Sequence, residues 1–200
     1  MTDVNLFEIF KIPVFSIKIS DSNSMNNNLT NLFKDLKNKD TDPYPYTLGG
    51  YTNYGGNSNI ILDYTECDPL KKEILDFAEH ISKEVSIYGK PFIESSWFSI
   101  NNKYSYHESH KHLPSVWSGV YYVKADQNDA KIIFEHKEKQ DSSWPFYSDY
   151  KHDYTTNTFS LSPVSGNLLF FPSYLSHRVE QQTVDQERIT ISFNIGMKQS

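Results

Sequence analysis

The chain has 200 residues and a formal net charge of -6. A chain of this length can bury one hydrophobic core, and no stretch rich in Gly, Ser or Pro divides it as a linker would. The acidic balance excludes a nucleic-acid partner bound through a basic surface, because such binding depends on clustered Lys and Arg. Cys67 is the only cysteine, which excludes an intrachain disulfide and favours a reducing compartment. With no basic leader and no long apolar run, we expect a cytoplasmic protein without a membrane partner.

The N-terminal part of the chain predicts a strand, a helix and a loop. Residues 7–19 carry β-formers interrupted by Pro13, which is typical of an edge strand. Apolar residues then recur at helical spacing between Met25 and Leu36. Residues 42–57 combine prolines, glycines and tyrosines, a composition that predicts a loop with stacking surface.

A second and clearer helix is predicted over residues 69–88. Asp68 is placed to cap its N-terminus, Pro69 suits the first turn, and Gly89 suits the end. One face carries a regular apolar stripe. His80 lies beside this stripe, and we expect it at the surface.

The second half of the chain changes to a pattern of short strands. They are expected over residues 92–101, 115–124, 130–136, 157–161, 167–172 and 187–196. In the last strand Ile189 and the alternate apolar residues share one face, while Arg188 and Thr190 share the other. The apolar face must meet helices and the polar face must meet a polar interior. We therefore expect a mainly β fold with flanking helices (α+β) and a jelly-roll core that holds a ligand.

We expect the chain to form a single domain over residues 1–200. In this organisation residues 1–91 pack on a core formed by residues 92–196. The core carries an insertion at 136–157, in which aromatic residues stand among charges. This insertion and the loop at 42–57 are candidates for segments that cover a substrate.

Three histidines have a spacing that suits a metal site. His110 and His112 flank Lys111, and residues i and i+2 of an extended strand point to the same side. His177 would supply a third ligand from a distant strand. Neutral imidazole suits iron, zinc and copper. An isolated His-x-His is more often an incidental surface pair, and the distal elements are what favour a metal site here.

Other readings of the same residues remain open. His107 could replace one of the ligands, although a loop location makes this the weaker option. His136 and His152 are interpreted as solvated residues on either side of the insertion. Arg188 could form a structural salt bridge with an acidic residue such as Glu135 instead of binding a ligand.

The segment from Trp97 to Asn194 resembles the Fe(II)- and 2-oxoglutarate-dependent oxygenases, in particular a bacterial and phage subgroup related to the prolyl 4-hydroxylases. The landmarks of the resemblance are residues 110–112, 118–124, 165–177 and 188–194. It implies a double-stranded β-helix, which is a jelly roll, and a metal held by His-x-Asp or His-x-Glu with a distal His. By position the ligands are His110, His112 and His177. An imidazole at His112 replaces the usual carboxylate and leaves the site one charge unit more positive.

The resemblance also implies Fe(II) and 2-oxoglutarate as cofactors, with Arg188 binding the distal carboxylate of 2-oxoglutarate. Thr190 lies beside Arg188, and Tyr122 helps to hold the same carboxylate. An arginine fork matches a carboxylate, and an unpaired arginine on an inward face would cost about 3–5 kcal/mol. The implied reaction hydroxylates a C–H bond of a peptidyl or small-molecule substrate and releases succinate and CO2.

Two other functions fit part of the pattern. A cupin-like three-histidine metal enzyme would use His110, His112 and His177 without 2-oxoglutarate, but it would not need Arg188. A non-catalytic jelly-roll binding or assembly module would leave the histidines incidental. The combination of the histidines with Arg188 favours the oxygenase over both.

Overall fold

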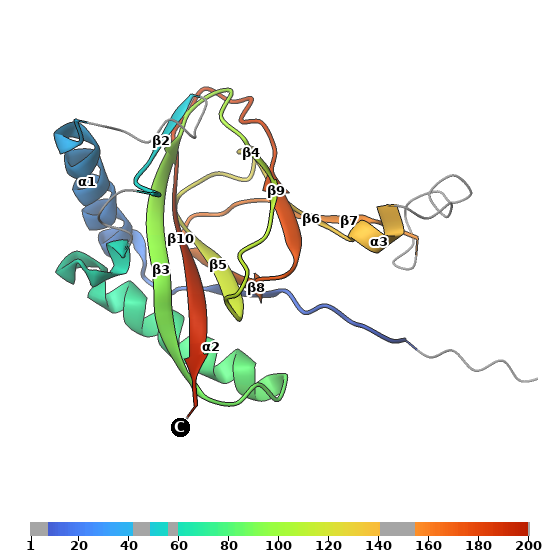
Figure 1. Ribbon diagram of the computed structural model, residues 1–200. Coiled ribbons are helices and arrows are strands. Elements are labelled where there is room, and N and C mark those ends of the chain that lie inside the picture. Colours follow the sequence, from blue (N-terminus) through green and yellow to red (C-terminus); the bar gives the residue numbers. More distant parts are fainter. Residues whose placement is uncertain (1–7, 42–48, 56–59, 141–154, 200) are drawn as a thin grey trace, which may run out of the picture.

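The computed structural model describes residues 8–41, 49–55, 60–140 and 155–199 (Figure 1). The helices in this part are α1 (Asn23–Lys39), α2 (Asp68–Glu84) and α3 (Lys137–Gln140), with 3-10 turns at Ile61–Asp63 and Thr65–Cys67. The strands are β1 (Phe15–Lys18), β2 (Gly50–Thr52), β3 (Lys90–Asn101), β4 (His107–His110), β5 (Trp117–Lys124), β6 (Ile132–Glu135), β7 (Thr158–Leu161), β8 (Asn167–Pro172), β9 (Ser176–Val179) and β10 (Arg188–Lys198). None of the helices in these ranges has the length and apolar character needed to span a bilayer.

The strands form two antiparallel sheets. The larger sheet has the order β1-β8-β5-β10-β3-β2 and the smaller sheet the order β4-β9-β6-β7. Helices α1 and α2 cover the outer face of the larger sheet, and the smaller sheet stands on its other side (Figure 1). This arrangement confirms the expected mainly β fold with a jelly-roll core and flanking helices, and it places β1 at a sheet edge as predicted.

Strand β10 shows why the core forms where it does. Ile189, Ile191 and Phe193 are buried in the cluster that also contains the apolar faces of α1 and α2. Full burial of each such side chain contributes about 1.5–3 kcal/mol relative to exposure. The intervening residues, beginning with Arg188 and Thr190, face the smaller sheet instead. The two faces predicted from the alternation are confirmed, and the polar one becomes the wall of the site.

Specific contacts fix each long helix to the larger sheet. The ring of Phe33 on α1 stacks on Phe98 of β3 with centroids 4.4 Å apart. The indole N–H of Trp117 on β5 donates to Ser82 Oγ on α2 at 2.9 Å. A buried indole needs such a partner, since an unsatisfied buried donor costs about 1–3 kcal/mol. The helices therefore support the strands from outside and leave the inner face of the sheet for the site.

Helix α2 begins and ends at other residues than predicted. Cys67 is the N-cap and Asp68 is the first helical residue. At the other end Ser86, with φ 58°, terminates the helix. The N–H of Ile87 bonds to Ser82 O at 2.8 Å, and the N–H of Ser86 bonds to a carbonyl of the last turn, which together form a Schellman motif. The expected stop at Gly89 was wrong because a serine adopted the left-handed conformation that glycine usually supplies.

The predicted strand boundaries were also incomplete. Strand β1 starts at Phe15, well after residue 7. The loop predicted over 42–57 contains β2, which pairs with the end of β3, while residues 42–48 and 56–57 lie outside the described residues. Strands β4 and β9 were expected only as the strands that carry the histidines, without a predicted range. Each of these strands has three or four residues, and such short segments are defined by their pairing partners more than by their own pattern.

Cys67 provides a test of this packing. Its side chain is fully buried, and burial raises the pKa of the thiol to about 12. Because the thiolate is the reactive form, we expect iodoacetamide in mildly alkaline buffer to leave the native protein unmodified. The urea-unfolded chain should be alkylated at the rate of a free thiol, as measured by mass spectrometry after timed quenching. Equal rates for the two states would contradict the buried position of Cys67.

Candidate metal centre and anion pocket

His110, His112 and His177 come together between the two sheets. Their ligand nitrogens all lie within 4.8 Å of one another. The ring centroids are 4.4 to 5.1 Å apart. Within the described ranges no Asp or Glu joins this group. The structure thus brings together the three histidines singled out by their spacing, and their role as metal ligands stays a prediction.

The strands position the histidines in a way that differs from the sequence argument. His110 is the last residue of β4 and is the cross-strand partner of His177 on β9. His112 lies beyond the strand, where its backbone N–H donates to Ser173 O at 2.9 Å. The expectation that His110 and His112 share one strand was therefore wrong. A loop held by the carbonyl of Ser173 turns the second imidazole toward the first.

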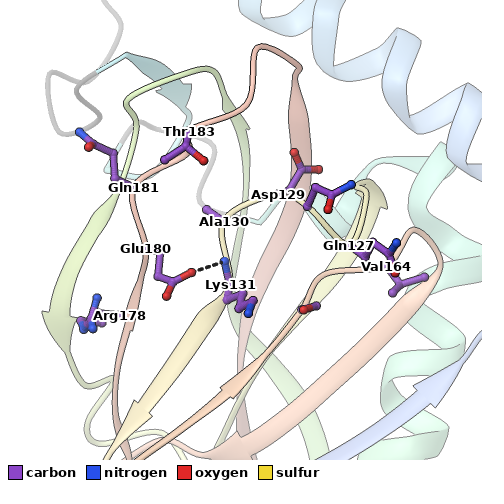
Figure 2. Close-up of a pocket in the computed structure, with 11 residues that line it drawn as sticks. Gln127, Asp129, Ala130, Lys131, Val164, Arg178, Glu180, Gln181 and Thr183 are labelled. Atoms are coloured by element: carbon purple, nitrogen blue, oxygen red, sulfur yellow. Dashed lines mark hydrogen bonds between the residues drawn. The ribbon is translucent and has the colours of Figure 1, made fainter.

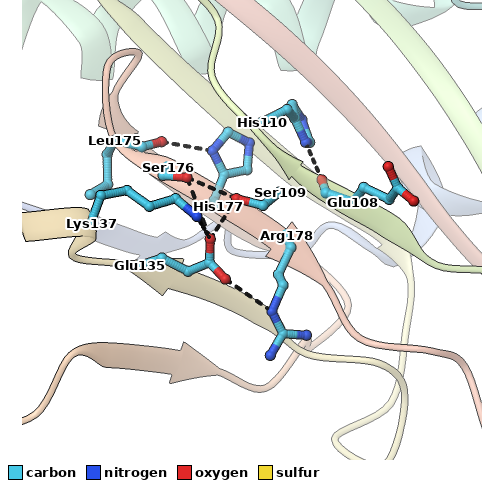
Figure 3. A network of polar contacts seen from close by, with 9 residues as sticks. All are labelled: Glu108, Ser109, His110, Glu135, Lys137, Leu175, Ser176, His177 and Arg178. Atoms are coloured by element: carbon cyan, nitrogen blue, oxygen red, sulfur yellow. Dashed lines mark hydrogen bonds and ion pairs between the residues drawn. The ribbon is translucent and has the colours of Figure 1, made fainter. Parts of the chain in front are cut away.

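Hydrogen bonds to backbone carbonyls orient two of the rings (Figure 3). His110 Nδ1 lies 2.7 Å from Glu108 O, and His177 Nδ1 lies 2.9 Å from Leu175 O. A carbonyl oxygen only accepts, so Nδ1 is the donor in both rings, and Nε2 is the nitrogen that could bind a metal. Burial lowers the pKa of His177 to about 3 and that of His112 to about 4. The imidazoles of His112 and His177 are therefore neutral at neutral pH, and a histidine must be neutral to bind a metal.

Aromatic side chains surround the cluster. The ring of Phe171 lies 4.6 Å from that of His177, and the ring of Trp97 lies 5.6 Å from that of His112. Tyr54 packs edge-on against Trp97 at 4.9 Å. These contacts give His112 and His177 an aromatic wall, while His110 is the most exposed of the three histidines.

Arg188 forms the other half of the site. The residue is only 4% exposed, and its Nε atom is buried without a hydrogen-bond partner. Glu135, considered above as an ion-pair partner for Arg188, pairs with Arg178 and Lys137 instead. Among the described residues, no carboxylate forms a salt bridge with Arg188. Asp129 is near enough to interact electrostatically with Arg188, but no salt bridge joins the two. A buried cation without a direct ion-pair partner is costly, so an anion beside Arg188 would be stabilising.

Thr190 and Tyr122 share the pocket with Arg188. Thr190 follows Arg188 by two residues on β10 and is the cross-strand partner of Tyr122 on β5. Cross-strand partners project from the same face of a sheet, so all three side chains point toward the smaller sheet. Tyr122 is 1% exposed, and burial raises the pKa of its hydroxyl to about 12. The phenol therefore stays neutral and can donate a hydrogen bond.

The sequence argument missed Asn101. It is the cross-strand partner of Arg188 on β3 and is 1% exposed, yet both Oδ1 and Nδ2 lack a hydrogen-bond partner. Oδ1 can accept from the unpartnered Arg188 Nε, and Nδ2 can donate to an anion. Gly50 leaves room beside this amide, since an added Cβ would lie 3.3 Å from Oδ1. The alternation of Phe98 and Ile100 with polar residues at the end of β3 was the available signal.

His107 lies closer to the pocket than expected. It begins β4 and pairs with Val179, so the loop location assumed for it was wrong. It does not belong to the group of three converging histidines. Burial, together with the smaller effect of the nearby charge of Arg188, lowers the pKa of His107 to about 4. Its imidazole is therefore a neutral neighbour of the arginine.

A separate polar pocket of about 710 Å³ lies beside β6 and β9 (Figure 2). Its walls are formed by Gln127, Asn128, Asp129, Ala130, Lys131, Ser162, Val164, Arg178, Glu180, Gln181 and Thr183. Neither the histidine cluster nor Arg188 lines it. Cationic and acidic side chains both line this pocket, so its charge does not favour one kind of ligand. The histidine cluster is therefore the better candidate for the catalytic site.

Comparison with solved structures shows the same fold. A prolyl-4-hydroxylase from Pseudomonas putida has 13% identity and a TM-score of 0.61, over 92% of this chain and 92% of that chain. The viral collagen prolyl hydroxylase of Paramecium Bursaria Chlorella virus-1, in complex with 2-oxoglutarate, has 13% identity and a TM-score of 0.56, over 91% and 94%. HygX from Streptomyces hygroscopicus, with nickel and 2-oxoglutarate bound, has 10% identity and a TM-score of 0.55, over 92% and 83%.

No curated protein matches the sequence. A family profile does match it, over residues 95–194, which is half of the chain and includes both the histidines and Arg188. Its description is 2OG-Fe(II) oxygenase, where 2OG stands for 2-oxoglutarate. The chain therefore belongs to the 2OG-Fe(II) oxygenase family and is an Fe(II)- and 2-oxoglutarate-dependent oxygenase.

Proposed function

We propose that His110, His112 and His177 hold the Fe(II) of this oxygenase. The observation that carries the proposal is the convergence of three imidazoles whose ligand nitrogens lie within 4.8 Å, two of them held by a backbone carbonyl at Nδ1. Imidazole suits iron, and three protein ligands leave open positions for cosubstrate and oxygen. With an imidazole at His112 in place of a carboxylate, the centre keeps the full charge of the metal ion. This added positive charge favours an anionic cosubstrate.

In the same proposal Arg188, Thr190 and Tyr122 bind the distal carboxylate of 2-oxoglutarate. Arg188 supplies the charge and a planar fork, and the two hydroxyl groups supply further donors. Asn101 would assist Arg188 through its side-chain amide. In this arrangement Oδ1 accepts from Arg188 Nε, and Nδ2 donates to the carboxylate. With these two bonds, neither of the buried donors Asn101 Nδ2 and Arg188 Nε would lack a partner.

The proposed reaction is hydroxylation of a C–H bond. When bound, Fe(II) and 2-oxoglutarate would supply the oxidative chemistry, in which one oxygen atom of O2 enters the substrate as a hydroxyl group and the other enters succinate, formed from 2-oxoglutarate with loss of CO2. The contribution of the chain is to hold the dicarboxylate in one orientation between Arg188 and the histidines. Trp97 and Phe171 exclude water from one side of the histidine cluster.

The substrate is proposed to be a peptidyl residue or a small molecule. Two of the similar structures are prolyl hydroxylases, and another structure of HygX contains hygromycin B. The net charge of -6 supports the exclusion of nucleic acid. We also propose a cytoplasmic protein of bacterial or phage origin, supported by the single cysteine and by the resemblance of the site motifs.

An anaerobic titration of the purified protein tests this function. Fe(II) followed by 2-oxoglutarate should produce the weak visible metal-to-ligand charge-transfer band, and neither component alone should do so. A screen of peptides and small metabolites for stimulated succinate release would then identify the substrate class. Metal binding without the band would favour a three-histidine enzyme that does not use 2-oxoglutarate.

A further inference from the structure

A second polar cluster lies behind the histidines, on the outer face of the smaller sheet (Figure 3). Its centre is the carboxylate of Glu135 on β6, which is 9% exposed. Oε2 accepts from Ser109 Oγ at 2.5 Å and from Lys137 Nζ at 2.9 Å, with Ser176 Oγ at 3.4 Å. Oε1 accepts from Arg178 Nε at 3.2 Å. One carboxylate thus joins side chains of β4, β6 and β9 and the start of α3.

The two serines in this cluster directly precede the proposed metal ligands. Ser109 is followed by His110, and Ser176 is followed by His177. Successive side chains of a strand point to opposite faces, so the serines face outward where the histidines face inward. Glu135 is the cross-strand partner of Ser176, which places its carboxylate on the outer face as well. A contact to each serine is therefore a contact to the backbone that carries the neighbouring histidine.

The backbone ladder is weak at this point. Strand β4 is a four-residue edge strand whose register against β9 shifts between His107 and His110. Ser109 lies within the shifted segment, where regular pairing does not fix the spacing of the strands. The two serine hydroxyls are 2.9 Å apart and share Glu135 as acceptor. Side-chain hydrogen bonds supply the lateral connection that the ladder lacks.

We propose that Glu135 is a positioning residue of the metal centre, which fixes the separation of His110 and His177 by holding Ser109 and Ser176. The inference rests on the proposed assignment of the two histidines as metal ligands. Lys137 and Arg178 neutralise the carboxylate, so the buried charge is compensated on its own side of the sheet. A leucine at position 135 would remove both carboxylate oxygens that accept from the cluster, whereas a glutamine would keep one acceptor oxygen.

Co(II) affinity of the full chain, measured from the visible absorption of the bound ion, tests the inference. Loss of a group that supports a metal ligand typically weakens metal binding by about 10- to 100-fold, so Glu135→Leu should raise the Kd for Co(II) at least about tenfold. Glu135→Gln should give a smaller increase. The double variant Ser109→Ala with Ser176→Ala should follow Glu135→Leu, and it decides the question if Glu135→Leu does not fold.

Asp129 offers a matched control. This carboxylate is 3% exposed and accepts from Gln182 Nε2 at 2.6 Å and from Gln186 Nε2 at 2.8 Å, but it contacts neither histidine-bearing strand through a serine. Asp129→Asn should lower thermal stability and leave the Co(II) Kd unchanged. Wild-type affinity in Glu135→Leu or in the serine double variant, while His177→Ala loses Co(II), overturns this inference alone. Co(II) binding that survives His177→Ala overturns the proposed metal site and the inference together.

Discussion

Replacement of His177 by alanine is expected to abolish iron binding and turnover together. His177 is the most enclosed of the three converging histidines, at 4% exposure, and its Nδ1 bond to Leu175 O aims Nε2 at the others. Changes to groups that merely support a ligand cost about 10- to 100-fold in metal affinity, so loss of the ligand itself should exceed about 100-fold. Anaerobic equilibrium dialysis against Fe(II), with succinate release measured in parallel, checks both effects.

His80→Ala is the control for this substitution. His80 is exposed on α2 as predicted and packs beside Phe77, with ring centroids 6.4 Å apart. It should change neither iron content nor turnover. Iron bound to His177→Ala at wild-type affinity would show that the convergence of the three rings is incidental.

Replacement of Arg188 by methionine should act in opposite directions on cosubstrate binding and on stability. Loss of a charge-assisted, bidentate contact worth about 3–5 kcal/mol predicts a rise of about 150- to 4,000-fold in the Kd for 2-oxoglutarate. Without the cosubstrate, however, the wild-type chain buries a guanidinium whose Nε is unsatisfied. The variant should therefore have a free energy of unfolding about 1–3 kcal/mol higher than that of the wild type in the absence of ligand.

Urea denaturation and anaerobic titration of the same preparation measure both quantities. Arg178→Met is the comparison for stability, because Arg178 is 40% exposed and paired with Glu135. It should lower the free energy of unfolding slightly, opposite in sign to Arg188→Met. A destabilised Arg188→Met variant that still binds 2-oxoglutarate normally would assign Arg188 a structural role.

The sequence predicted the parts of the fold that have long local patterns. The helical stripe of α2 and the alternation of β10 were sufficient to place a core on one face and a polar wall on the other. The ends of the elements were predicted less accurately. Helix α2, for example, ends at Ser86 in a left-handed conformation that serine rarely adopts.

The roles of the candidate site residues stay predictions, and the residues that support them were predicted less well. Arg188, Thr190 and Tyr122 lie on strands, where side chains alternate between the two faces, so the face of each residue can be predicted from its position in the sequence. His112 reaches the cluster through a loop, and no periodicity describes a loop. Asn101 was missed because its unpaired amide becomes informative only once β3 is seen to pair with β10 beside Arg188.

The two halves of the site belong to different sheets. His110 and His177 stand on β4 and β9 of the smaller sheet, while Arg188 and Tyr122 stand on β10 and β5 of the larger. A metal-bound dicarboxylate that reaches Arg188 is therefore a cross-link between the layers of the sandwich. Any opening motion that separates the layers must first release it, so occupancy suppresses that motion in proportion to ligand concentration. On the proposed assignment of Arg188 and the histidines, the cosubstrate would hold the two sheets together as well as take part in the oxidation.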